Sequence, residues 1–256
     1  MTSFLNNFGN LILPLSLGVL MLISWRIGVG LGERLKMRDS QSRSSKFDDV
    51  SMALLGLLMA FTFGISISKY DQRRLAVVAD SNAIGDFYNC ASLLKEPVRT
   101  ELRRVIREYV QLRVHLTTVR IDDATLEDAL HRFEEMQSKM VALVNQALRD
   151  GTPIAVPLTN TLNELTSNHA SRLAAVRDKL PMSVLVLLCV SSIIAAVLVC
   201  REQGLAPPKE SAGTLSFIIL VVLAMYTIID LNQPDKGLIT ISQEPMVRLY
   251  ASMPVD

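Results

Sequence analysis

The chain has few cysteines, few aromatic residues and almost no net charge. Among its 256 residues only three are cysteine, 5% are aromatic, and the formal net charge is +1. Cys189 and Cys200 lie in one apolar stretch, which leaves Cys90 alone in the polar part of the chain. A disulfide framework and a cysteine-based zinc site are therefore not predicted. Nucleic-acid binding is not predicted either, because there is neither a basic stripe nor a set of interleaved aromatic residues.

The motifs of common enzymes are also missing. No GxSxG, P-loop, GxGxxG, HExxH or kinase-like set occurs. We therefore predict that the protein is not an enzyme and uses no cofactor. His131 stands near Glu134 and Glu135, and these residues either bind a divalent ion or form an ordinary solvated helix face. The second interpretation is favoured because the symmetry of a bundle metal site is lacking, so no metal is predicted.

What the chain does have is four long apolar stretches. Half of its residues are hydrophobic although a fifth are charged, as expected for membrane spans joined to a polar part. Each stretch has about 18–20 residues, and at about 1.5 Å per residue such a helix crosses a bilayer core of roughly 30 Å. A polar, serine-rich connector is expected over residues 30–49. The predicted transmembrane helices are residues 8–27, 50–68, 182–200 and 214–231.

The polar middle of the chain follows helical periodicity, and alternating strand patterns are absent. The predicted fold is an all-α membrane protein with four transmembrane helices in two hairpins and a helical cytosolic domain between the second and third. The second helix is expected to continue beyond the membrane to about residue 84. The predicted divisions are residues 1–68 (first hairpin), 69–180 (helical domain), 181–231 (second hairpin) and 232–256 (C-terminal cytosolic segment).

Charge counting does not orient the protein. An even number of spans places both termini and residues 69–180 on one side of the membrane. Lys and Arg residues near the spans are almost equally frequent on the two sides, so the positive-inside rule does not decide which side is cytoplasmic. The lone Cys90 favours the cytoplasm slightly.

The second apolar stretch has three distinguishable faces. One carries small residues every fourth position (Gly56, Ala60 and Gly64), a pattern that allows close helix packing. In an oligomer, one such face could surround a central axis, where apolar rings gate by dewetting and hydroxyl and charged rings select ions. The alternative is ordinary packing in a monomer with lipid contact, and the pattern alone favours it slightly. The pore-lining candidates on these faces are Leu58, Phe61, Thr62, Ile65, Ser66 and Lys69.

Two further residues are candidates for a gating or a structural role. His169 lies within the apolar stripe of its helix, where it either senses protons or is simply packed and hydrogen-bonded; the second interpretation is favoured. Asp230 stands at the end of the fourth stretch. Ionisable residues close to the bilayer are functional candidates, although Asp230 is equally explained as an interfacial residue that caps a turn with Asn232.

Several segments resemble one known family, the bacterial bestrophin-like membrane proteins, which are distantly similar to bestrophin ion channels. The resemblance covers most of residues 50–253. It is carried by LLGLLMAFTFGISISKYDQRR, by NAIGDFY with LLKEPVRTELRRVIREYVQLR, by LNELTSNHASRLAAVRDKLP, and by DLNQPDKGLITISQEP.

Bestrophins are pentameric channels whose second helix lines the pore and whose helical part and termini are cytosolic. The resemblance therefore implies a homo-oligomer, a pentamer, in the bacterial inner membrane, with lipid and inorganic ions as partners and the termini in the cytoplasm. The chain departs from bestrophins in two places. In place of an aromatic-rich neck the chain has Leu58, Phe61 and Ile65. Around the C-terminal segment it has too few acidic residues (Asp230, Asp235 and Glu244) to predict a calcium clasp. The alternative is a non-conducting scaffold or sensor that acts through its helical domain.

Overall fold

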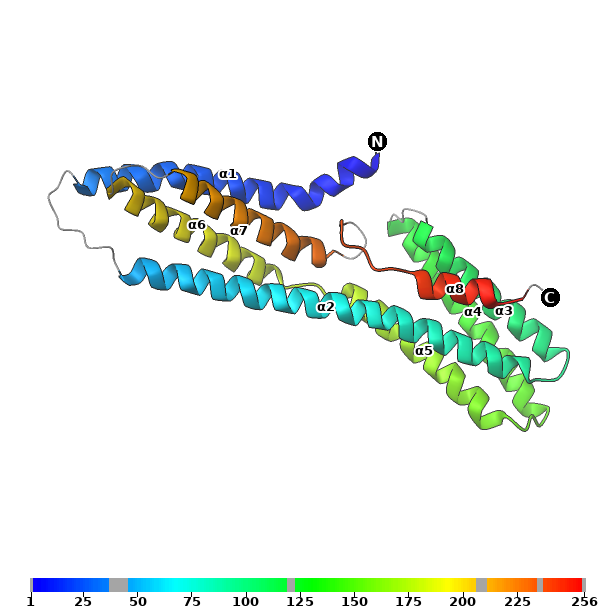
Figure 1. The fold of residues 1–256 in the computed structure, drawn as a ribbon. Helices are drawn as coiled ribbons and strands as arrows, with labels where there is room; N and C mark the ends of the chain where they lie inside the picture. Colours follow the sequence, from blue (N-terminus) through cyan, green and yellow to red (C-terminus); the bar gives the residue numbers. More distant parts are fainter. Residues whose placement is uncertain (1, 37–45, 119–122, 206–210, 234–236, 255–256) are drawn as a thin grey trace. The chain divides into compact units, whose positions relative to one another are not determined.

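The computed structural model describes residues 2–36, 46–118, 123–205, 211–233 and 237–254, and every element in this part of the chain is an α-helix. The predicted all-α class is therefore confirmed (Figure 1). The helices are α1 (Thr2–Lys36), α2 (Lys46–Ser92), α3 (Val98–Thr118), α4 (Asp123–Arg149), α5 (Ala155–Arg177), α6 (Met182–Leu205), α7 (Ser211–Leu231) and α8 (Glu244–Ser252).

Four helical regions are long and apolar enough to cross a membrane, as predicted. In the third of these regions the charged residues before Pro181 lie in α5 and at residues 178–179, so the apolar part is α6, which begins after Pro181 and reaches Arg201 without another charge. These regions make the chain a membrane protein. They are Ile12–Arg34, Asp49–Ser92, Ala155–Arg201 and Ala212–Leu231.

The connector between the first two spans is shorter than predicted. We expected it over residues 30–49, but α1 continues to Lys36 and α2 already begins at Lys46. Helix-forming Glu, Arg, Leu and Lys residues extend α1 past its last glycine, because nothing at residues 33–36 stops a helix. Residues 37–45 lie outside the described part.

Helix α2 is one helix of 47 residues and runs well beyond the length of a membrane span (Figure 1). It contains no proline, so its backbone hydrogen bonds are not interrupted. The predicted continuation beyond residue 68 is confirmed, and the helix extends past Gly85 to Ser92. A Cβ at Gly85 would lie 3.4 Å from Leu249 Cδ1, so α8 packs closely against α2 at this position.

The chain divides into two compact units, and the first comprises residues 1–70 and 178–240. In this unit α1 packs along α6 and α7. The approach of α1 to α6 requires Gly28, since a Cβ there would lie 2.7 Å from both Cys200 Cβ and the Val197 carbonyl oxygen. The apolar core of this unit includes Leu17, Met21, Leu55, Leu188, Ala195, Ala196, Ile218 and Met225.

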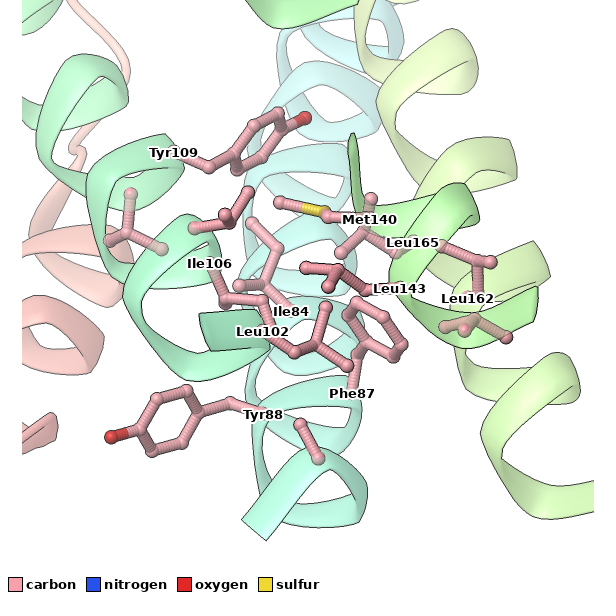
Figure 2. Close-up of a cluster of buried hydrophobic side chains, with 14 of the residues drawn as sticks. Ile84, Phe87, Tyr88, Leu102, Ile106, Tyr109, Met140, Leu143, Leu162 and Leu165 are labelled. Carbon is pink, nitrogen blue, oxygen red and sulfur yellow. The ribbon is translucent and has the colours of Figure 1, made fainter. Parts of the chain in front are cut away.

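The second unit comprises residues 71–177 and 241–256. Its helices are the outer part of α2 with α3, α4, α5 and α8, and their apolar faces form one core (Figure 2). The apolar residues that follow the predicted helical periodicity form this core: Leu102, Ile106 and Met140, for example, are fully buried. Figure 2 shows Tyr88 and Tyr109 at opposite ends of the labelled cluster.

Candidate functional site

The hydroxyl residues of the second span face the interior of the first unit. Thr62 is 5% exposed and Ser66 is 1% exposed. Thr62 Oγ1 donates to the Leu58 carbonyl oxygen and Ser66 Oγ to the Thr62 carbonyl oxygen, both at 2.8 Å. These hydroxyls are therefore satisfied by the backbone of their own helix.

The large apolar residues of the same span lie on a different face. Phe61 is 64% exposed and Ile65 49% exposed, whereas Leu58 is half-buried and packs against the core of the first unit. At about 100° per residue, Thr62 lies about a quarter of a turn from Phe61 around the helix axis. In a single chain the structure thus separates Phe61 and Ile65 from Thr62 and Ser66.

Two basic residues at the end of this span bind the end of α5 and the residue beyond it. Lys69 Nζ lies 2.5 Å from Asp178 Oδ2. Arg73 is 2% exposed, and its Nε donates to the Ala175 carbonyl oxygen at 3.0 Å. Ala175 is in the last turn of α5, where carbonyl oxygens lack helical partners and the helix dipole attracts a cation. Sequence reasoning identified Lys69 as a candidate but not the direction in which its side chain points.

The small residues of the second span are open in a single chain. Gly56, Ala60 and Gly64 are exposed. A Cβ at Gly56 or Gly64 would meet no other atom within 4 Å, apart from the helix's own backbone and chain neighbours. A close helix contact at this face would therefore need a second chain, and its packing role stays a prediction.

Asp230 fixes the backbone that follows α7. It is 1% exposed, its Oδ1 accepts a hydrogen bond from the Leu238 N–H at 2.9 Å, and its Oδ2 accepts one from the Ile239 N–H at 2.8 Å. Nearby, Asn232 Oδ1 accepts the Leu180 N–H at 2.7 Å. The sequence identified both polar residues, but their backbone partners follow only from the fold. Asp235 lies outside the described residues.

Replacing Gly237 with alanine is expected to break this arrangement. The new Cβ would lie 2.7 Å from Asp230 Cγ, so the carboxylate would have to leave the two amides that it accepts. Losing these buried hydrogen bonds costs about 2 kcal/mol, or a fall in Tm of about 5 °C in detergent. The control is Gly213→Ala in α7, where a Cβ would meet nothing within 4 Å. Equal Tm values for the two variants would contradict the prediction.

A buried charge cluster in the second unit was not predicted from the sequence. Asp80 of α2 is fully buried, and its Oδ2 lies 2.8 Å from Arg172 Nη1 of α5 and 3.5 Å from Arg113 Nη2 of α3. The two arginine side chains are only 14% and 8% exposed. One carboxylate thus pairs with two guanidinium groups, which makes it costly to remove. A signal was present: Asp80 interrupts the apolar face between Val77 and Ile84.

His169 contacts this cluster through Nδ1. Arg113 Nη2 lies against His169 Nδ1 and also donates to Tyr109 Oη at 2.9 Å. The guanidinium carbon lies 4.8 Å from the centre of the Phe133 ring. Arginine can only donate, so Nδ1 is the acceptor, and the neutral imidazole carries its proton on Nε2. Burial, followed by the positive charge of Arg113, lowers the pKa of His169 from 6.5 to about 4.

The low pKa of His169 predicts a loss of stability in acid. An unfolded histidine takes up a proton near pH 6.5, whereas the folded one does so only near pH 4. The unfolded state therefore binds more protons between these values, and Tm falls as the pH is lowered from 6.5 to 4 and levels off below. His169→Gln keeps an acceptor for Arg113 but does not titrate, so Tm should depend less on pH in this window.

The matched control for this prediction is His131→Gln. His131 is exposed, and its Nδ1 lies 3.8 Å from Glu134 Oε2, which is exposed as well. This variant should keep the wild-type dependence of Tm on pH. If His169→Gln also keeps it, then His169 is protonated in the folded protein well above pH 4.

Within the described residues, no group of three or more metal-binding side chains is placed to hold an ion.

The comparisons with known proteins point to one family. A family model described as the Bestrophin-like domain matches residues 49–246. This range includes all the candidate residues of the second span, the buried charge cluster and Asp230. No curated protein and no solved structure matches the chain.

Proposed function

As the chain belongs to the bestrophin-like family, we propose that it is a homo-oligomeric ion channel of the bacterial inner membrane. The subunits, five in the proposed pentamer, surround an axis lined by α2. The four spans form two hairpins, and the helical domain and both termini are cytoplasmic. Inorganic ions pass along the axis, and lipid covers the outer helices.

The observation that carries this proposal is the exposed apolar face of α2. Phe61 and Leu57 are 64% and 53% exposed, and on the same side of the helix Leu75 is 59% exposed. Leu75 lies beyond the apolar stretch, where lipid tails do not cover a side chain. Ser68 and Gln72 interrupt this side of the helix, but an exposed large apolar residue beyond the membrane favours contact with protein, here with other copies of α2.

This exposed face also refines the predicted pore. Of the pore-lining candidates, Phe61 and Ile65 are exposed in a single chain, so we place them at the constriction with Leu58 beside them. Rings of large apolar side chains gate by excluding water. Thr62 and Ser66 lie on the inner side, where their hydroxyls bond to the backbone of α2 itself, and Lys69 pairs with Asp178. Gly56, Ala60 and Gly64 remain available for contact with a neighbouring subunit.

Ion flux into liposomes tests the proposal. The full-length protein is purified, its subunit number is measured by native mass spectrometry, and ion flux is recorded with and without the protein. We expect a closed oligomer and protein-dependent flux. A well-folded oligomer without flux would contradict the channel and favour a non-conducting scaffold. A monomer that captures a heterologous partner on cross-linking in native membranes would favour the sensor alternative.

A further inference from the structure

The C-terminal residues 241–254, here called the tail, contact α2 in the second unit. Ser81 Oγ of α2 donates to the Pro245 carbonyl oxygen at 3.0 Å. One turn further along α2, Gly85 leaves room for Leu249 of α8. Met246 is fully buried in the core of this unit. The tail is therefore a packed part of the second unit.

Arg172 links the tail to α2 a second time. Its Nη1 donates to Asp80 Oδ2 of α2, and its Nη2 donates to Gln243 Oε1 at the start of the tail, both at 2.8 Å. Gln243 is the residue immediately before α8. Asp80 and Ser81 are neighbours in α2. Asp80 holds the tail through Arg172, and Ser81 holds it directly.

The charge balance of this site means that the strength of the Arg172–Gln243 hydrogen bond can be changed by substitution. Two buried arginines, Arg113 and Arg172, face one carboxylate, Asp80, so the cluster carries one uncompensated positive charge. On the side of Arg172 that faces the tail, its Nη2 donates to a neutral amide. A planar guanidinium binds two acceptors at once with its two Nη atoms, which a lysine ammonium does less well.

We propose that Arg172 is a positioning residue that holds the tail against α2, and that the strength of the Arg172–Gln243 contact sets how closely the tail is held. The consequence for ion flux rests on the proposed function, in which α2 lines the pore. A tail held more loosely leaves α2 freer to move, and a tail held more tightly restrains it.

Three substitutions test the proposal, and they are expected to change hydrogen exchange in α8 in opposite directions. Gln243→Ala removes the acceptor, and Arg172→Lys keeps the positive charge beside Asp80 but loses the two-sided guanidinium. Both should speed hydrogen exchange of the α8 amides at least threefold. Gln243→Glu gives Arg172 a charged acceptor, which strengthens the hydrogen bond, and should slow this exchange. Arg248→Ala is the control, because Arg248 is exposed and pairs with exposed Glu244 in its own helix.

Flux in liposomes is measured on the same variants. Gln243→Ala and Arg172→Lys should shift it at least threefold in one direction, and Gln243→Glu should shift it in the other. Hydrogen exchange in α8 that is unchanged, or that changes equally in all the variants, would overturn the positioning role of Arg172. Exchange that moves as expected with unchanged flux would overturn the coupling to α2. A wild type without flux would overturn the proposed function, while the exchange measurement still decides the role of Arg172.

Discussion

Asp80→Ala is expected to destabilise the protein more than any other single substitution in the second unit. Asp80 is fully buried, and without it Arg172 and Arg113 would be left as buried cations with no carboxylate partner within the charge cluster. Breaking a buried ion pair from one side costs about 3–5 kcal/mol. For a chain of this length that corresponds to a fall in Tm of about 10 °C. The measurement is thermal unfolding of the full-length protein in detergent.

Two controls separate lost charge pairing from general damage to α2. Asp86→Ala changes an exposed carboxylate of the same helix and should shift Tm by no more than about 1–2 °C. The triple variant Asp80→Leu, Arg113→Met and Arg172→Met replaces the whole charge cluster with apolar side chains of similar size. It should recover most of the lost stability, because the cost of desolvating three buried charges disappears together with the attraction between them. A triple variant as unstable as Asp80→Ala would contradict this explanation.

The sequence predicted the parts of the fold that depend on local periodicity. The four apolar stretches and the buried faces of Leu102, Met140 and Leu158 follow from residues a few positions apart on one helix. The continuation of α2 beyond the membrane is likewise local, since no residue in it stops a helix. The start of the first connector was predicted less well, because polar residues such as Glu33 and Lys36 suit a helix and a loop alike.

The parts that were missed depend on residues distant in the sequence. Asp80 and Arg172 are 92 positions apart, and only the packing of α2 on α5 brings them together. Asp230 accepts from amides eight and nine residues further along, and this spacing matches no helix or strand period. The sequence distinguished the faces of the second span. The other helices of the first unit determine which of these faces is buried. The sequence alone therefore could not place Thr62 on the buried side and Phe61 on the exposed side.

Phe61→Ala is expected to change ion flux more than any other substitution in the second span. Phe61 is 64% exposed in a single chain, so the loss of its ring costs little stability. In the proposed oligomer the substitution removes one large apolar ring per subunit from the constriction, and the wider opening holds water more readily. We expect flux to rise about tenfold, which corresponds to a barrier lower by about 1.4 kcal/mol.

Phe63→Ala is the matched control for this prediction. Phe63 belongs to the same helix and is 38% exposed, but two residues along an α-helix turn it about 200° away from Phe61. It would therefore face away from the axis, and its loss should leave flux unchanged although the same ring is removed. Flux is compared in liposomes at equal protein content, after native mass spectrometry has shown the same subunit number for both variants. If the two variants conduct equally, Phe61 does not face the axis, and the exposed face of α2 is covered by lipid instead of by other subunits.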